Sequence, residues 1–213
     1  PPSLDTYPDS SPRILDRHGV VLDEAPRADL FRHQPVSLDE IPAALLDATL
    51  VAEDKRFFTH DGMDLLATVR ATRDCLRHHR VISGASTITQ QLIKISSPPA
   101  PRSIVTKIRE SLSARHLEYR WSKEEILTAY FNRLDYGNHR QGCRDAARFY
   151  FAKPLTDLSL GECALLAGLP QSPSRHNPVR HAASALQRRN WILDRLAEVK
   201  NYDRDQIAAA KRE

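Results

Sequence analysis

The sequence has 213 residues, few cysteines and no long apolar run. The three cysteines, Cys75, Cys143 and Cys163, are too few and too scattered for a disulfide framework or a zinc site, so we expect ordinary buried thiols. The longest apolar run, CALLAGL at 163–169, is much shorter than the roughly 18 residues that a membrane span needs. These absences exclude a disulfide-based scaffold and a membrane span within this sequence.

The sequence also lacks an initial Met, a signal peptide and any internal repeat. The missing Met and signal peptide predict an excised fragment or a trimmed chain. Residues 1–12 are rich in Pro, Ser and Asp, which predicts a loose leader before a domain at 13–213. That length is sufficient for one sizeable domain, or for two lobes that share a core.

Positive charge is in excess, because Lys and Arg outnumber Asp and Glu by four and the sequence pI is about 9.1. An anionic partner is therefore expected, such as phosphate, nucleic acid or a lipid headgroup surface. Nucleic acid is the weakest of these candidates, because the basic residues are not interleaved with aromatics in a recognisable binding module. We therefore predict no nucleic-acid partner.

Local patterns predict a mainly α fold with a small β-hairpin near the N-terminus. The segment RILDRHGVVLDEA at 13–25 has two β-prone runs around a turn at 16–19. Capping-box spacing occurs at 37–40, 122–125 and 159–162, although Pro42 could equally mark the first turn of the first helix. The end of the sequence, from residue 181, reads as two helices, the first of them basic, and they are a candidate link to a further domain.

Two segments carry chemistry. In AEDKRFFTH at 52–60, Glu53 and Asp54 fall at the end of a buried helix, followed by two cations, two aromatics and a histidine. Spacing alone leaves Glu53 open between a solvated helix-end carboxylate and a catalytic one. In GASTITQQLIK at 84–94, hydroxyls and amides at a helix start suit a phosphate or sugar ligand. SSPPAPRS at 96–103 is predicted to be a surface loop or flap.

Five motifs in order resemble one known family. They are EDKRFFTHDG, GASTITQQ, KIRE, KEEILTAYFNRLDYG and LSLGECALLAGLPQSPSRHNP, and the match as a whole runs from roughly residue 13 to residue 178. Together they are similar to the family 51 peptidoglycan glycosyltransferases, found in class A penicillin-binding proteins and in monofunctional cell-wall transglycosylases. The resemblance implies a lysozyme-like, two-lobed, mainly α fold with a cleft between the lobes.

The resemblance also implies a reaction. Such enzymes polymerise lipid II into β-1,4-linked glycan strands with inversion, and undecaprenyl pyrophosphate departs from the growing chain. The partners implied are lipid II, the growing glycan on undecaprenyl pyrophosphate and the membrane surface. The implied location is the outer, periplasmic face of the bacterial cytoplasmic membrane, with an anchor that this sequence does not contain. A transpeptidase domain or other cell-wall synthesis proteins would be further partners. No S-x-x-K, S-x-N or K-T-G set occurs here, so we expect either a monofunctional protein or the glycosyltransferase part of a longer one.

Site roles follow from the matched motifs. Glu53 corresponds to the general base, and Glu110 to a second carboxylate that orients cations or pyrophosphate. The matched substrate-binding candidates are Asp54, Arg56, Ser86, Thr87, Gln90, Gln91, Lys94 and Lys107. Several have structural alternatives: Asp54 as local support, Arg56 as a surface ion pair, Ser86 and Thr87 as helix caps, and Lys107 with Glu110 as a helix salt bridge.

Three further expectations concern metals and departures from the family. No cofactor is required, although a divalent cation, Mg²⁺ or Mn²⁺, could screen the pyrophosphate, and His60 lacks a second ligand at metal spacing. Thr106 stands where the family usually has Arg, which removes one charge expected on the donor. Ala152 stands where the family usually has Gly, which is tolerable if the backbone there is not left-handed.

Two other functions remain open. A lysozyme-type lytic hydrolase would also place a Glu in a helical cleft, but it would need no cations for a pyrophosphate. A degenerate lipid-linked-glycan binding module without turnover is favoured only by Thr106. Glu53 and Glu110, both present, favour the polymerase instead.

Overall fold

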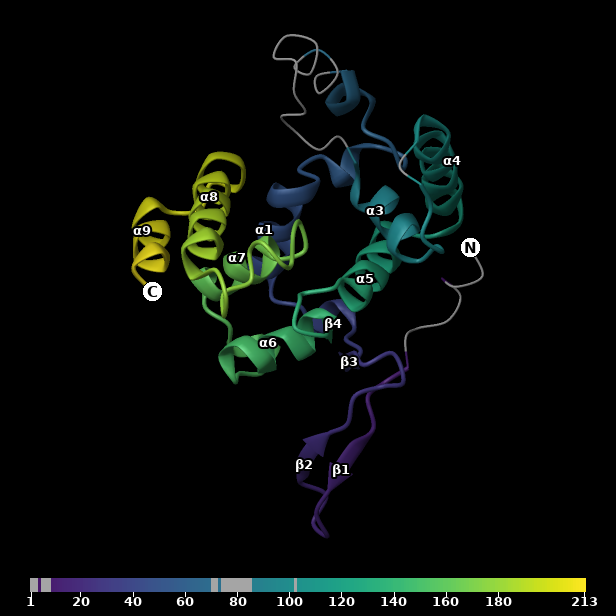
Figure 1. The fold of residues 1–213 in the computed structure, drawn as a ribbon. Helices are drawn as coiled ribbons and strands as arrows, with labels where there is room; N and C mark the ends of the chain where they lie inside the picture. The colour runs from purple at the N-terminus through teal and green to yellow at the C-terminus, as the bar shows by residue number, and fades with distance from the viewer. Residues whose placement is uncertain (1–3, 5–8, 70–72, 74–85, 102) are drawn as a thin grey trace. The chain divides into compact units, whose positions relative to one another are not determined.

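The computed structural model describes residues 4, 9–69, 73, 86–101 and 103–213 (Figure 1). The chain divides into two compact units. The first unit comprises residues 1–5 and 53–130, and the second comprises residues 6–52 and 131–213. Helices dominate both units and the described strands are short, so the predicted mainly α fold is confirmed. None of the described helices is long and apolar enough to cross a membrane.

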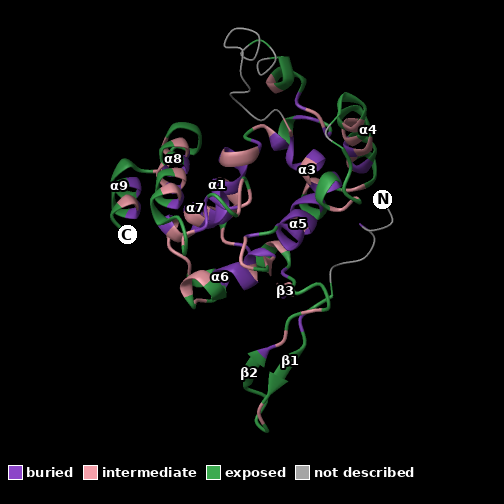
Figure 2. Ribbon diagram, viewed as in Figure 1, coloured by how far each residue is buried: buried purple, intermediate pink, exposed green. Residues whose placement is uncertain are grey.

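A hairpin opens the second unit. Strand β1 (Arg13–Leu15) pairs antiparallel with β2 (Val21–Glu24). Asp16 Oδ1 accepts the backbone N–H groups of His18 and Val20, each at 2.8 Å, and this turn chemistry closes the hairpin. The predicted hairpin is thus confirmed, and Figure 2 shows that most of its residues are exposed.

Helices form the core of the second unit. They are α1 (Ala43–Glu53, which enters the first unit at Glu53), α6 (Cys143–Phe151), α7 (Leu160–Gly168), α8 (Ala182–Lys200) and α9 (Arg204–Arg212). Helix α7 packs along α8, where Gly168 allows Arg188 and Ile192 to approach its backbone closely. A short parallel pair, β3 (Arg32–His33) with β4 (Arg140–Gln141), joins distant parts of this unit, and α8 with α9 are the two predicted C-terminal helices.

The predicted caps form. The hydroxyl of Ser159 and the carboxylate of Glu162 make the reciprocal capping box that begins α7. Before α5 (Lys123–Arg133) the backbone N–H of Ser122 donates to Glu125 at 2.7 Å. The box at 37–40 instead caps a 3₁₀ turn, η2 (Leu38–Glu40), and α1 begins directly after Pro42, so both signals that the sequence offered are used.

The backbone at Ala152 differs from the conformation in which Ala was expected from the sequence to be tolerated. Ala152 ends α6 in the left-handed region, with φ 54° and ψ 30°. The replacement of Gly by Ala was expected to be tolerable only outside that region, and the structure places it inside. Since Cβ crowds the following carbonyl in this conformation, Ala152 carries a local strain that Gly would not.

The first unit contains the 3₁₀ turn η3 (Phe57–Thr59), α3 (Ile88–Ile95), α4 (Ile104–Arg120) and the residues of α5 up to Tyr130. Helix α3 packs against α4, and the largest buried side chains of this unit are Phe57, Ile88, Leu92, Ile126, Leu127 and Tyr130. Residues 96–101 are irregular and become exposed from 98 onward, as the predicted loop requires. Arg102, in the same loop, lies outside the described residues.

Two of the three cysteines can be assessed. Cys143 and Cys163 are buried free thiols, as predicted. Burial raises the pKa of each to about 12. Cys75 lies outside the described residues, as do Gly84 and Ala85, the first two residues of the GASTITQQ motif.

Candidate active site

Glu53 ends α1, and its carboxylate is held from α3. Gln91 Nε2 donates to Glu53 Oε2 at 3.0 Å, and Gln91 Oε1 accepts the hydroxyl of Tyr130 at 2.9 Å. Tyr130 is fully buried on α5. Burial, and then the negative charges of Glu53 and Asp54, raise the pKa of Tyr130 well above its ordinary value, so its hydroxyl stays protonated. Three helices therefore contribute to the placement of one carboxylate.

Asp54 faces the protein interior. Its Oδ2 accepts the backbone N–H of Ile88 at 3.0 Å and lies 3.0 Å from His60 Nε2. The side chains of Asp54 and His60 are only 4% and 5% exposed. Because Ile88 is the first residue of α3, the negative charge of Asp54 also lies at the positive end of the helix dipole. Direct contact of Asp54 with a substrate stays a prediction, while its support of local structure is visible in these hydrogen bonds.

Thr87 and Gln90 organise the start of α3. Thr87 is the N-cap and forms a capping box with Gln90. The Thr87 hydroxyl donates to the carbonyl of Gly62 at 2.7 Å, and Gln90 Nε2 donates to Ser111 on α4 at 3.1 Å. Both side chains are buried, so these bonds attach α3 to its neighbours. Their roles toward a substrate stay predictions.

Ser86, Lys107 and Glu110 meet at a more exposed place. Lys107 Nζ donates to Ser86 Oγ at 2.8 Å and to Glu110 Oε2 at 3.2 Å. The Lys107 side chain is 47% exposed and that of Glu110 is 16% exposed. The salt bridge between Lys107 and Glu110, which the sequence offered as a structural alternative, is formed. Ser86 accepts a further hydrogen bond from the same lysine. A cation with half its side chain in solvent keeps the capacity to meet an anionic group.

Thr106, the departure from the family pattern, serves the beginning of α4. Its hydroxyl donates to the carbonyl of Pro101 at 2.8 Å and lies 3.0 Å from the hydroxyl of Ser103, the N-cap. An uncharged side chain therefore has a structural use here. Lys94, the cation predicted to follow the second motif, is exposed in the last turn of α3.

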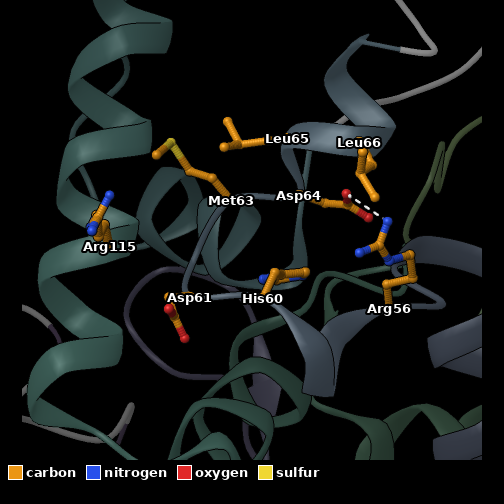
Figure 3. Close-up of a pocket in the computed structure, with 8 residues that line it drawn as sticks. All are labelled: Arg56, His60, Asp61, Met63, Asp64, Leu65, Leu66 and Arg115. Carbon is orange, nitrogen blue, oxygen red and sulfur yellow. Dashed lines mark ion pairs between the residues drawn. The ribbon is translucent and has the colours of Figure 1, made fainter.

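Arg56 borders a pocket of about 220 Å³ in the first unit (Figure 3). Its guanidinium lies 3.5 Å from Asp64, whose side chain is only 5% exposed. Arg56 thus forms an ion pair, as the structural alternative from the sequence proposed, but with a buried carboxylate and not at the surface. Arg115 on α4 lies across the pocket, and the remaining lining is mixed, from His60, Asp61, Met63, Leu65 and Leu66. The pocket combines two cations with an apolar edge.

The ion pair between Lys123 and Glu118, which adjoins the pocket at His60, was not predicted from the sequence. Lys123 Nζ donates to Glu118 Oε2 at 2.6 Å and to the carbonyl of His60 at 2.7 Å, and it lies 4.3 Å from the centre of the Phe57 ring. Glu118 also accepts the hydroxyl of Thr89. Lys123 and Tyr130 both belong to the KEEILTAY motif, which was the available signal. Within the described residues, no cluster of three or more His, Cys, Asp or Glu is placed to hold a metal ion.

Comparison with known proteins now identifies the class. Residues 19–197 match the family model described as transglycosylase, so the chain belongs to the transglycosylase family. This confirms the predicted membership of the family 51 peptidoglycan glycosyltransferases.

Individual members of the family show which proteins this chain resembles. Penicillin-binding protein 1A of Pseudomonas aeruginosa is 39% identical over 183 residues, which are 86% of this chain and 22% of that protein. A candidate transglycosylase of Cupriavidus necator is 40% identical over 182 residues, covering 84% of this chain and 78% of that protein. The crystal structure of penicillin-binding protein 1A from Haemophilus influenzae matches 98% of this chain and 21% of its own at a TM-score of 0.57 and 23% identity, which supports the fold. The chain spans about a fifth of the length of the penicillin-binding proteins that it matches.

Proposed function

We propose that this chain is the peptidoglycan glycosyltransferase domain of a cell-wall enzyme and that it polymerises lipid II with Glu53 as general base. The contact of Gln91 with Glu53 is the observation that carries the proposal. This hydrogen bond holds the Glu53 side chain in place beside the polar side chains of α3. Family membership supplies the reaction class, and the motif that contains Glu53 supplies the role.

The proposed reaction forms one bond and breaks one bond at the same carbon. The 4-hydroxyl oxygen of the acceptor GlcNAc attacks the anomeric carbon of the donor glycan and forms the β-1,4 bond. The bond from that carbon to the pyrophosphate oxygen breaks, and undecaprenyl pyrophosphate departs with the electron pair. Glu53 takes the proton from the attacking hydroxyl.

Charge on the departing pyrophosphate needs cations. Arg56, Lys94 and Lys107 are the proposed sources, with Glu110 orienting Lys107 through the 3.2 Å contact. Mg²⁺ or Mn²⁺ would act as an additional counterion of the pyrophosphate. The substrates, the outer face of the cytoplasmic membrane as location, and a transpeptidase domain or other synthesis proteins as partners all belong to this proposal.

Incubation of the chain with labelled lipid II in detergent, followed by gel separation, tests the proposal. We expect the parent to yield a ladder of lengthening glycans and Glu53→Gln to yield none, with at least a hundredfold lower rate, because the amide keeps the shape but cannot accept the proton. Glu198→Gln, an exposed change on α8 in the second unit, is the matched control and should keep the ladder.

Other outcomes would point elsewhere. Lipid II binding without a ladder from the parent would contradict the polymerase and favour a binding module. Shortening of preformed glycan strands would favour the lytic hydrolase. Circular dichroism of both variants must match the parent before either result is assigned to chemistry.

A further inference from the structure

The hydrogen bonds around Glu53 have a defined direction. An ionised carboxylate only accepts, so Gln91 must present its NH₂ group to Glu53. The carbonyl oxygen of the same amide then faces Tyr130, whose hydroxyl donates to it. If the Gln91 amide turned over, its carbonyl oxygen would face the carboxylate of Glu53 and the hydrogen bond to Glu53 would be lost. Glu53 thus fixes the orientation of Gln91, and the hydrogen bond from the Tyr130 hydroxyl to the Gln91 carbonyl stabilises that orientation.

Tyr130 is suited to fixing this orientation. Its side chain is fully buried in the first unit, so it is shielded from solvent and from dissolved substrate. Burial and the nearby carboxylates raise the pKa of its phenol, which keeps the hydroxyl a donor across the pH range in which an enzyme works. Phe at the same position would keep the ring and its packing but would lose the donor.

We propose that Tyr130 is a positioning residue that acts through Gln91 to orient Glu53 and to favour its charged form. The inference rests on the proposed function, in which Glu53 is the general base. A base must be deprotonated to accept the acceptor's proton, so a hydrogen bond that favours the carboxylate extends activity to lower pH. Tyr130 touches no reacting atom in this scheme.

Tyr130→Phe is the first test, with kcat and KM measured against pH. The variant loses the donor that holds the Gln91 carbonyl, so the N–H bond to Glu53 weakens. We expect kcat to fall about tenfold at neutral pH, the acidic limb of the kcat profile to move to higher pH, and KM to change less than about twofold. Tyr150→Phe, which loses a 2.8 Å hydroxyl bond to the Tyr136 carbonyl in the second unit, is the matched control and should leave the profile unchanged.

A double-variant cycle tests whether the effect passes through Gln91. If it does, adding Tyr130→Phe to Gln91→Ala should cost little further activity. Effects that multiply would overturn the proposal, and so would a kcat that falls equally at every pH with no movement of the acidic limb.

A readout without turnover separates this proposal from the proposed function. The carboxyl carbon of Glu53, labelled with ¹³C and assigned by its loss in Glu53→Gln, can be titrated by NMR in the parent and in Tyr130→Phe. We expect a higher protonation midpoint in the variant. That result with an inactive parent would leave the positioning intact and contradict the polymerase; identical midpoints with an active parent would contradict the positioning alone.

Discussion

Ala152 has a strained left-handed backbone conformation, and substitution by Gly should relieve the strain. Its left-handed backbone costs a residue with a Cβ roughly 1–2 kcal/mol, while Gly adopts it freely but loses more entropy on folding. We expect Ala152→Gly to raise the free energy of unfolding by about 0.5–1 kcal/mol, measured by urea denaturation.

A second helix end in the same unit provides the control. Asn201 ends α8 with φ 56° and ψ 34°, and Asn tolerates this region better than Ala does. Asn201→Gly should therefore change stability by only a few tenths of a kcal/mol. Equal gains at both positions would show that the strain at Ala152 is not what limits stability there.

At the scale of elements, Lys123 joins three segments. It is the first residue of α5, and it pairs with Glu118 on α4 and with the carbonyl of His60 just after η3. The Glu118 side chain is only 5% exposed, so removing Lys123 leaves a buried charge without its cation and with the hydroxyl of Thr89 as a remaining donor. We expect Lys123→Met to lower the free energy of unfolding by about 3 kcal/mol. Urea denaturation at constant pH would measure it.

Two comparisons isolate the buried charge. Lys123→Met combined with Glu118→Gln should recover part of the loss, because the unpaired charge is gone. Lys153→Met breaks a pair whose lysine is 44% exposed and should cost less than about 1 kcal/mol. A loss as large at Lys153 as at Lys123 would refute burial as the cause.

The range of the interaction separates what the sequence could predict from what it could not. The caps at Ser122 and Ser159 and the turn at Asp16 join residues within four positions, so spacing was sufficient. Gln91 lies 38 residues from Glu53, and Lys123 lies 63 residues from His60. Such pairs depend on how the helices pack and on which rotamers the side chains adopt. Neither can be predicted from the spacing of residues in a single sequence. Gln91 was therefore predicted as a substrate ligand, and its bond to Glu53 came from the structure.

For the whole molecule, buried histidine makes stability depend on pH. His33, the last residue of β3, is fully buried, with Nδ1 3.0 Å from the carbonyl of Gln141 on β4. Burial lowers the pKa of His33 below 6.5, against the opposing effect of the Gln141 carbonyl, and the charges of Arg27 and Arg133 lower it further. The folded state therefore resists protonation at a place where the unfolded chain accepts it.

The direction of the effect follows from proton binding. Below about pH 6.5 the unfolded chain binds a proton at His33 that the folded chain does not, so the free energy of unfolding falls as pH is lowered through this range and levels off below the folded pKa. We expect the melting temperature of the parent to drop between pH 7.5 and 5.5. His33→Asn, whose amide can replace the Nδ1 donor, should melt lower at pH 7.5 because a cavity remains, yet with a shallower dependence on pH. His18→Asn, an exposed change in the hairpin turn, should keep the parent's slope, and a slope in His33→Asn equal to that of the parent would assign the acid sensitivity to other groups.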